Sequence, residues 1–435
     1  MAIGSPISNL QSTNLPRASG APIPANSTMS LETISLTEYE PRRLPADALG
    51  EDVGRLLWQR YDHELGVLQV AFPSPRTGQQ WELTSRGWVG HIPLGPGRRL
   101  ALQPRAPLDN VLRMLALVYD LQSFHLLVGL VGSEALSDVY ERLAALLARR
   151  VLVRARQGFY RAYIEQTAQL PYVRGRMDPV ASRALAGQPQ VTCRFDEATT
   201  DVVDNQILAW TLRCIAHSGL CANGAQELVR RAAHSLDGVA RPLPVSADEC
   251  AQRTYHRLNE EYRPLHALCR FFLEQSGPNH RPGDRDMIPF LVSMPRLYEQ
   301  FVARWLDAHL PAPWMVRAQE RVAVEMASHP LSFFPDLVLY DGRGAARMVL
   351  DTKYKMPQTP AAADVAQVVA YAQSKGCREA ALVYPRPLSR PLAARVGEVR
   401  VRALHFELKG DLQACGRAFL QQLGHCLWAS PKAPA

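Results

Sequence analysis

The spacing of apolar side chains changes along the chain, and the first change separates strands from helices. Short apolar runs broken by Gly and Pro occupy Leu31 to Gln103, which is typical of strands joined by turns. A helix is then predicted from Asn110 to about Gln122, with Asp109 as its N-cap. The chain therefore opens with a mixed region in which strands precede a helix.

A longer region with helical spacing follows. Apolar residues recur every three or four positions over three stretches, namely Ser137 to about Glu165, 204–217 and 247–272. A cluster of Gly, Pro, Asn and Asp at 275–285 then interrupts all periodicity and predicts a domain boundary. The middle of the chain is expected to be mainly helical.

The last third alternates between the two patterns. A helix is predicted from Arg296 to His309, followed by two β-rich runs, Leu337 to Tyr340 and Arg347 to Leu350. The turn sequence Asp341-Gly-Arg-Gly between those runs is a strong hairpin signal. A helix over 363–373 and a strand over 380–384 complete a mixed α/β unit.

These patterns predict a multi-domain α+β protein with four segments. Residues 1–28, rich in Ser, Pro and Asn, are expected to form a disordered tail. The other segments are a strand-rich mixed domain, a mainly helical middle region and a C-terminal α/β domain, with the boundaries 29–150, 151–280 and 285–435.

Composition favours an anionic partner and a reducing compartment. The net charge is +8, and from Arg285 onward 19 Lys or Arg stand against 13 Asp or Glu, so +6 of the excess lies in the last third. The eight cysteines form no CxxC pair, which favours free thiols in a cytoplasmic protein. The most apolar stretch, Val111 to Val131, contains charged residues and is no membrane span.

Candidate chemistry gathers on the predicted hairpin. Asp351 and Lys353 lie two apart on one strand and therefore share a face, and the hairpin brings Asp336 alongside them. Two carboxylates, with the backbone carbonyl of Thr352 and waters, suit Mg²⁺. The ion would polarise a phosphoryl oxygen and help ionise a water, while the Lys353 ammonium orients that water or offsets charge.

The pattern Pro335-Asp336, fourteen residues, then Asp351-Thr352-Lys353 resembles the PD-(D/E)xK motif of restriction-type nucleases. That superfamily often places a further acid on the preceding helix, where Glu299 stands, and supporting polar residues on the following helix, where Gln367 and Tyr371 stand. We count Glu299 and Gln367 as candidate catalytic residues. The alternatives are that Glu299 is a solvated helix residue and that Tyr371 belongs to the core.

Beyond this motif, the sequence resembles the McrC family, the nuclease subunits of McrBC-type modification-dependent restriction systems. The shared segments run through all three domains: Gly87 to Gly90, Leu102 to Arg105, Asn110 to Leu115, Arg174 to Arg176, Phe195 to Glu197, Thr200-Asp201, Asp204 to Leu208, Asp351 to Lys355 and Asp364 to Tyr371. The resemblance implies an endonuclease that cuts modified double-stranded DNA within a hetero-oligomeric complex.

The resemblance also implies a partner, an AAA+ GTPase like McrB that reads the modified base. In such systems the N-terminal part, here about residues 29–150, docks into the partner ring and stimulates its GTPase. The chain has no Gly-Lys pair and no Lys before Lys353, so it contains no P-loop of its own.

Three hypotheses remain open on the sequence. The first is the partner-dependent endonuclease, the second is an autonomous nuclease in DNA repair or processing, and the third is a non-catalytic adaptor of the ring. A basic stretch from Arg149 to Arg183 fits either a phosphate-contacting surface or a solvated face. Within it, Arg174 and Arg176 could contact DNA or the partner, or form a buried ion pair with Asp201 or Asp204.

Overall fold

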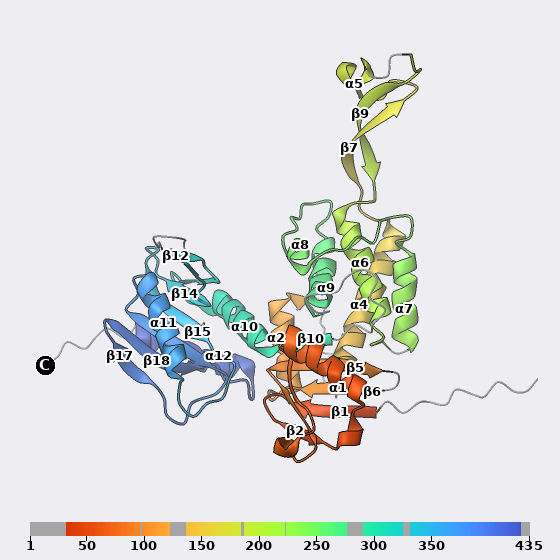
Figure 1. The fold of residues 1–435 in the computed structure, drawn as a ribbon. Helices are drawn as coiled ribbons and strands as arrows, with labels where there is room; N and C mark the ends of the chain where they lie inside the picture. Colours follow the sequence, from red (N-terminus) through yellow and green to blue (C-terminus); the bar gives the residue numbers. More distant parts are fainter. Residues whose placement is uncertain are drawn as a thin grey trace, which may run out of the picture.

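The computed structural model describes residues 32–95, 98–121, 136–183, 187–221, 223–275, 290–324 and 331–427. These residues form an N-terminal part with two small sheets, a helical middle, a β arm projecting from it, and a C-terminal α/β part (Figure 1). The expected mixed α/β multi-domain class is confirmed at this level. The predicted tail and, apart from Gln275, the predicted boundary at 275–285 lie outside the described residues.

The N-terminal part joins two sheets over one apolar core. The first sheet has the order β1-β6-β5-β10, in which only β1 and β6 run parallel. Its strands are β1 (Glu32–Thr37), β5 (Trp88–Gly95), β6 (Arg98–Gln103) and β10 (Phe290–Ser293). The second sheet has the order β2-β4-β3, and its strands are β2 (Arg42–Leu44), β3 (Leu68–Ala71) and β4 (Trp81–Ser85).

Short helices connect the strands of the second sheet and pack against the apolar core. The core includes Leu36, Leu57, Trp81 and Leu100. The short helices are η1 (Ala46–Ala48), α1 (Glu51–Leu56), the π-helical η2 (Leu57–Glu64) and η3 (Pro75–Thr77). The predicted order, strands first and then a helix near Asn110, is confirmed for β1 to β6 and α2 (Leu108–Val118), but the helices α1 and η2 between β2 and β3 were not predicted.

The helical middle packs around apolar faces that the periodicity identified. Its helices are α2 (Leu108–Val118), α4 (Leu136–Gln157), α6 (Val203–His217), α7 (Asn223–His234), α8 (Ala247–Ala251) and α9 (Tyr262–Gln275). The prediction that Asp109 caps α2 is wrong, because the N-cap is Pro107 and Asp109 lies in the first turn, where its carboxylate favours the helix dipole.

Two predicted helices end earlier than their periodicity indicated. The helix expected to reach Glu165 stops at Gln157, because Gly158 takes a left-handed φ of 92°. The helix expected over 247–272 is interrupted between α8 and α9. There, buried Asn259 accepts from the His256 backbone N–H and donates to Asp204, which stabilises a turn instead of a helix.

A β arm begins at Ala162, where the sequence predicted that the first of these helices would continue to Glu165. It consists of β7 (Ala162–Leu170), β8 (Arg176–Met177), α5 (Pro179–Arg183) and β9 (Val191–Thr199), with β9 central. β7 and β9 pair antiparallel from Ala162↔Thr199 to Leu170↔Val191, so both ends of the arm meet at the helices. Figure 1 shows the arm standing clear of the rest of the chain.

The C-terminal part is built on a six-stranded sheet of order β11-β14-β15-β16-β18-β17. β15, β16 and β18 are parallel, and the other neighbours are antiparallel. The strands are β11 (Met315–Ala318), β14 (Leu337–Tyr340), β15 (Ala346–Thr352), β16 (Glu379–Tyr384), β17 (Ala393–Val396) and β18 (Val399–His405). A separate pair consists of β12 (Val322–Val324) and β13 (Leu331–Phe333).

Helices cover both faces of this sheet, which accounts for its nearly continuous apolar strands. The three helices are α10 (Met294–His309), α11 (Ala362–Ser374) and α12 (Leu412–Leu427). Val349 faces the core shared with α11, and its neighbour Leu350 faces the core that includes Phe301 of α10 and Phe419 of α12. The predicted helix, hairpin, helix and strand of this part are confirmed.

No helix within the described ranges is long and apolar enough to cross a membrane.

Candidate active site

The β14–β15 hairpin sets the geometry of the candidate site. Asp341 shapes the turn, because its Oδ1 accepts the backbone N–H groups of Arg343 at 2.9 Å and Ala345 at 3.0 Å. Leu337 pairs with Leu350 in the ladder. Asp336 and Asp351, the next residue on each side, therefore meet at the same end of the hairpin.

Asp336 is fixed by the residue that follows Asp351. Its Oδ2 accepts the Thr352 backbone N–H at 2.7 Å and the Thr352 hydroxyl at 2.8 Å. The sequence assigned Thr352 only a backbone carbonyl ligand, whereas its N–H and hydroxyl both orient Asp336. The two bonds tie the start of β14 to the end of β15 and leave the other Asp336 carboxylate oxygen for a ligand.

A chain of polar contacts runs from Asp351 onto α11. The Lys353 ammonium lies 2.7 Å from Asp351 Oδ2 and donates to Gln367 Oε1 at 3.0 Å. Gln367 Nε2 in turn donates to the Tyr371 hydroxyl at 2.9 Å. The structure thus brings Asp336, Asp351, Lys353 and Gln367 together, and α11 holds the lysine from the opposite side to the carboxylate.

Glu299 reaches the same place from α10. Its carboxylate accepts a hydrogen bond from Gln319 Nε2, and the Gln319 backbone N–H donates to the Asp336 carbonyl at 3.0 Å. Gln319 has a left-handed φ of 50°, a conformation that costs free energy for a residue with a side chain. Such strain at a contact between two candidate acids is typical of functional sites.

Burial and mutual repulsion disfavour the charged forms of the three acids. Burial first, then the Asp336 charge, raises the pKa of Asp351 to about 6, despite the opposing Lys353 ammonium. The same two causes raise the pKa of Glu299 to about 7. Burial also raises the pKa of Asp336, against the two bonds from Thr352. Burial alone would lower the pKa of Lys353, but the bond to Asp351 and the acidic charges raise it.

These observations fit a divalent cation bound by oxygen ligands. Asp336 and Asp351 are buried, and the charge of Asp336 raises the pKa of Asp351 further. A bound cation would stabilise both ionised carboxylates, because its charge offsets the cost of burying them and the repulsion between them. Within the described residues, no group of three His, Cys, Asp or Glu side chains is arranged to hold a metal ion. A cation here would therefore rely on Asp336 and Asp351, with the Thr352 carbonyl and waters completing its shell.

The basic residues that the structure describes in the middle region are not among the contacts of the hairpin site, and several of them form ion pairs with nearby carboxylates. Of the two alternatives for Arg174 and Arg176, a buried ion pair with Asp201 or Asp204 is excluded for Arg174, which lies 3.5 Å from Glu197 and stacks on Phe195. Asp201 pairs with Arg241 and Asp204 with Arg253.

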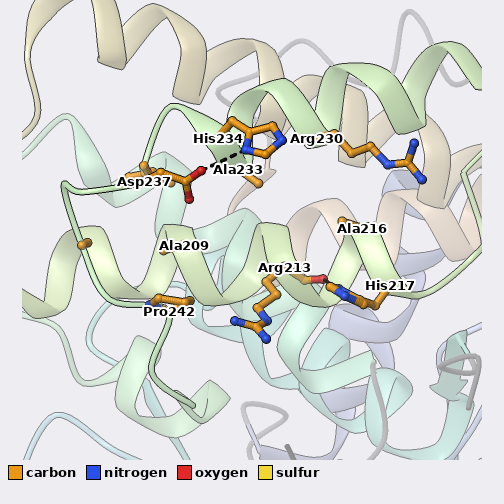
Figure 2. A pocket seen from close by; sticks show the side chains of 11 residues that line it. Ala209, Arg213, Ala216, His217, Arg230, Ala233, His234, Asp237 and Pro242 are labelled. Atoms are coloured by element: carbon orange, nitrogen blue, oxygen red, sulfur yellow. Dashed lines mark hydrogen bonds and ion pairs between the residues drawn. The ribbon is translucent and has the colours of Figure 1, made fainter. Parts of the chain in front are cut away.

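A basic groove of about 470 Å³ lies between α6 and α7. In Figure 2, Arg213 and His217 line one side of it and Arg230 and His234 the other, with the His234–Asp237 pair at 2.9 Å. Its single carboxylate is already paired, so it offers charge for an anion but no hydrolytic centre.

Sequence patterns missed two groups of residues around the site. Gln319 joins Glu299 to Asp336, and no motif or periodicity singles it out. Glu38 and Tyr39 contact Tyr354, the residue after Lys353, from more than 300 positions away. Only a tertiary structure reveals such contacts.

Comparison with known proteins identifies the family. A sequence model described as "McrBC 5-methylcytosine restriction system component" matches residues 83–385. The fold is similar to a chain in the refined half-complex from the tetradecameric assembly of Thermococcus gammatolerans McrB AAA+ hexamers with bound McrC. The TM-score is 0.54 at 18% identity, over 90% of this chain and 100% of that one.

A second similar structure is the cryo-EM structure of the Thermococcus gammatolerans McrBC complex, with a TM-score of 0.42 at 19% identity, over 63% of this chain and 87% of that one. No curated protein matches. Because the family match covers well over half of its length, the chain belongs to the McrBC 5-methylcytosine restriction system component family.

Proposed function

We propose that this chain is the DNA-cutting subunit of a McrBC-like system and that its C-terminal part is a PD-(D/E)xK nuclease domain. The observation that carries the proposal is the meeting of Asp336, Asp351 and Lys353 at the end of one hairpin, with Lys353 2.7 Å from Asp351. Membership of a restriction-system family supports a nuclease in general. The acidic pair and its lysine support phosphodiester hydrolysis in particular.

Asp336, Asp351 and the Thr352 carbonyl would hold Mg²⁺. When bound, the ion supplies Lewis-acid polarisation of the phosphoryl oxygen and lowers the pKa of a water. Thr352 keeps Asp336 aimed through two hydrogen bonds. Lys353, steered by Gln367, would orient the attacking water or donate to a non-bridging phosphate oxygen as charge develops there.

Glu299 is suited to accept a proton. Burial is the largest cause that raises its pKa above the ordinary value, and a raised pKa makes a carboxylate a better acceptor for a proton of water. The water oxygen forms the new bond to phosphorus as Glu299 receives a proton of that water, and the bond from phosphorus to the sugar oxygen breaks. The leaving oxygen takes a proton from solvent water. Gln319 holds the Glu299 carboxylate for this step.

The partner would be an AAA+ GTPase. One structural neighbour is described as McrB AAA+ hexamers with bound McrC, and this sequence contains no P-loop of its own. We therefore assign nucleotide hydrolysis and reading of the modified base to a McrB-like chain. The substrate would be methylated double-stranded DNA, in keeping with the 5-methylcytosine description of the family.

The decisive experiment is a cleavage assay with the partner, GTP and Mg²⁺ on methylated and unmethylated plasmid. We expect Asp351→Ala and Lys353→Ala to lower the cleavage rate at least about a hundredfold, because each removes a charge that acts on the reacting phosphate. Exposed Asp307 and Lys409 provide charge-matched controls, and Asp307→Ala and Lys409→Ala should cut as the unaltered chain does.

Each other outcome has a clear meaning. Undiminished cleavage by both site variants would refute the proposed site. Cleavage without the partner would favour an autonomous nuclease in repair or processing. Stimulation of the partner's GTPase without any cutting by the unaltered chain would favour the adaptor.

A further inference from the structure

Two consecutive residues of the N-terminal part bind the residue that follows Lys353. The Tyr354 hydroxyl donates to Glu38 Oε1 at 2.7 Å, and the Tyr39 hydroxyl donates to the Tyr354 backbone carbonyl at 3.3 Å. Glu38 and Tyr39 directly follow β1, whereas Tyr354 lies just beyond β15. Both ends of Tyr354, side chain and backbone, are therefore held by the N-terminal sheet.

Glu38 is buried and held in place by hydrogen bonds to the N-terminal part. Its side chain is 0% exposed, its backbone N–H donates to Gln103 at 3.0 Å, and its Oε1 also accepts the Arg105 backbone N–H at 2.7 Å. Burial raises the pKa of Glu38, so keeping a carboxyl group there costs free energy that an apolar side chain would avoid. Its two hydrogen bonds, from the Arg105 N–H and from the Tyr354 hydroxyl, offset that cost.

Tyr354 is buried and belongs to the main apolar core, but one side of it borders open space. Its ring lies 5.8 Å from the ring of Tyr298 on one side. A cavity of about 1020 Å³, lined also by Arg105 and Met356, opens beside it. Core packing holds the ring, and the two hydrogen bonds add a directional restraint on its hydroxyl and on its backbone carbonyl.

Lys353 depends on its backbone position to reach its partners. Its N–H donates to the Val383 carbonyl at 2.8 Å, which is the last support from the sheet before the chain turns toward Tyr354. Its ammonium must then lie within contact of both Asp351 and Gln367. A shift of the backbone just after Lys353 moves the ammonium relative to the phosphate.

We propose that Glu38 and Tyr39 are positioning residues for Lys353, acting through Tyr354, so that DNA cutting requires the N-terminal sheet to be seated against the end of β15. The inference deepens the proposed function and rests on it. Seating has independent support, because β10, an edge strand of the N-terminal sheet, runs directly into α10, which packs in the C-terminal part. Removing one hydroxyl at Tyr354 therefore leaves the two parts joined.

Tyr354→Phe tests the inference, with Tyr119→Phe as the matched control. Tyr119 is also a buried tyrosine whose hydroxyl donates to a carboxylate, Glu274 at 2.5 Å, but it lies away from the hairpin. We expect Tyr354→Phe to slow single-turnover cleavage about tenfold or more through misplacement of Lys353. DNA affinity and stimulation of the partner's GTPase should stay unchanged. Tyr119→Phe should cut at the rate of the unaltered chain.

Glu38 variants separate the hydrogen bond from the charge. Glu38→Gln keeps an oxygen acceptor for Tyr354 and should retain most of the cleavage rate, whereas Glu38→Ala should match Tyr354→Phe. Equal loss of cleavage in Tyr354→Phe and Tyr119→Phe, or no loss in Tyr354→Phe, would overturn the inference.

A second measurement does not depend on nuclease activity. Amide hydrogen exchange at Lys353 to Lys355 should accelerate in Tyr354→Phe and stay unchanged in Tyr119→Phe. Unchanged exchange in Tyr354→Phe would overturn the positioning role even if the chain proves to be a nuclease. A third outcome is possible. If exchange accelerates in Tyr354→Phe while Asp351→Ala still cuts DNA at the full rate, the contact that positions Lys353 is supported and the proposed catalytic site is rejected.

Discussion

The C-terminal sheet and the β arm are both antiparallel or mixed sheets, yet they differ in almost every physical respect. All residues of β14 and β16 are buried, and helices cover both faces of their sheet. In β7, by contrast, no residue is buried, and Tyr163 is 78% exposed. The first sheet is held by its core, whereas the second depends mainly on its ladder, with Thr192 and Cys193 as its buried residues.

The difference shows how the molecule separates rigidity from accessibility. A candidate site that must hold two acids and a lysine within ångströms lies at the end of the buried sheet. The arm exposes apolar side chains that a buried sheet would cover, among them Tyr172, Val173 and Val180. Four measurements test whether stability and function follow this division.

The largest effect is expected from Leu350→Ala in the C-terminal sheet. Leu350 is 0% exposed and belongs to the main core, so the cavity should lower the free energy of unfolding by about 2–5 kcal/mol. Tyr163→Ala on the arm, the matched control, should change it by under about 0.5 kcal/mol. Urea unfolding measures both, and similar losses for the two variants would erase the contrast.

Asp351→Asn should stabilise the metal-free protein. The pKa of Asp351 is about 6 in the folded chain, above its ordinary 3.8, so its contribution to stability is full below about pH 4 and is lost as the pH rises through 6. A neutral Asn avoids that loss, which is worth about 3 kcal/mol at pH 8, because the pKa of about 6 already includes the opposing Lys353 contact. Thermal unfolding at pH 8 and pH 4 tests this, and a gain at pH 4 equal to that at pH 8 would contradict it.

Binding of Mg²⁺ should strengthen as the pH rises. Asp351 with a pKa of about 6 must lose its proton to bind the ion. We therefore expect roughly tenfold tighter binding at pH 8 than at pH 5, from the ionised fraction of Asp351 alone. Titration calorimetry measures the affinity, and Asp351→Asn is the control that should abolish this dependence. A flat profile in the unaltered chain would show that Asp351 is no ligand.

The smallest effect on stability is expected from removing the arm. Ala162 and Thr199 face each other at its base, so an Asn-Gly turn can replace the residues between them. Unfolding of the remaining chain should change by less than about 1 kcal/mol, because the arm contributes little to the core. Collapse of the helical middle in this variant would show that the arm supports it.

The sequence predicted those elements whose pattern is local. The Asp341 turn between two apolar runs identified the hairpin, and the spacing of Asp336, Asp351 and Lys353 placed three side chains at one end of it. The arm escaped prediction because β7, with Ile164 and Tyr163 both exposed, lacks the alternation that marks a half-buried strand. Its first residues continued the helical period of α4 instead.

The supporting contacts of the site were beyond the reach of any pattern. Gln319 has no motif around it, and its importance lies in a left-handed backbone and a bond to Glu299. Glu38 and Tyr354 meet across 316 positions. Such contacts arise when separately folded elements pack together, and a single sequence carries no local trace of them.

The junction between β10 and α10 has a mechanical consequence. β10 is an edge strand of the N-terminal sheet, and α10, which carries Glu299, begins at the very next residue. Met294 is also anchored by its N–H to the Gly87 carbonyl at 2.9 Å. Because no loop separates the strand from the helix, we expect a rotation of the N-terminal sheet to displace Glu299 at the candidate site directly.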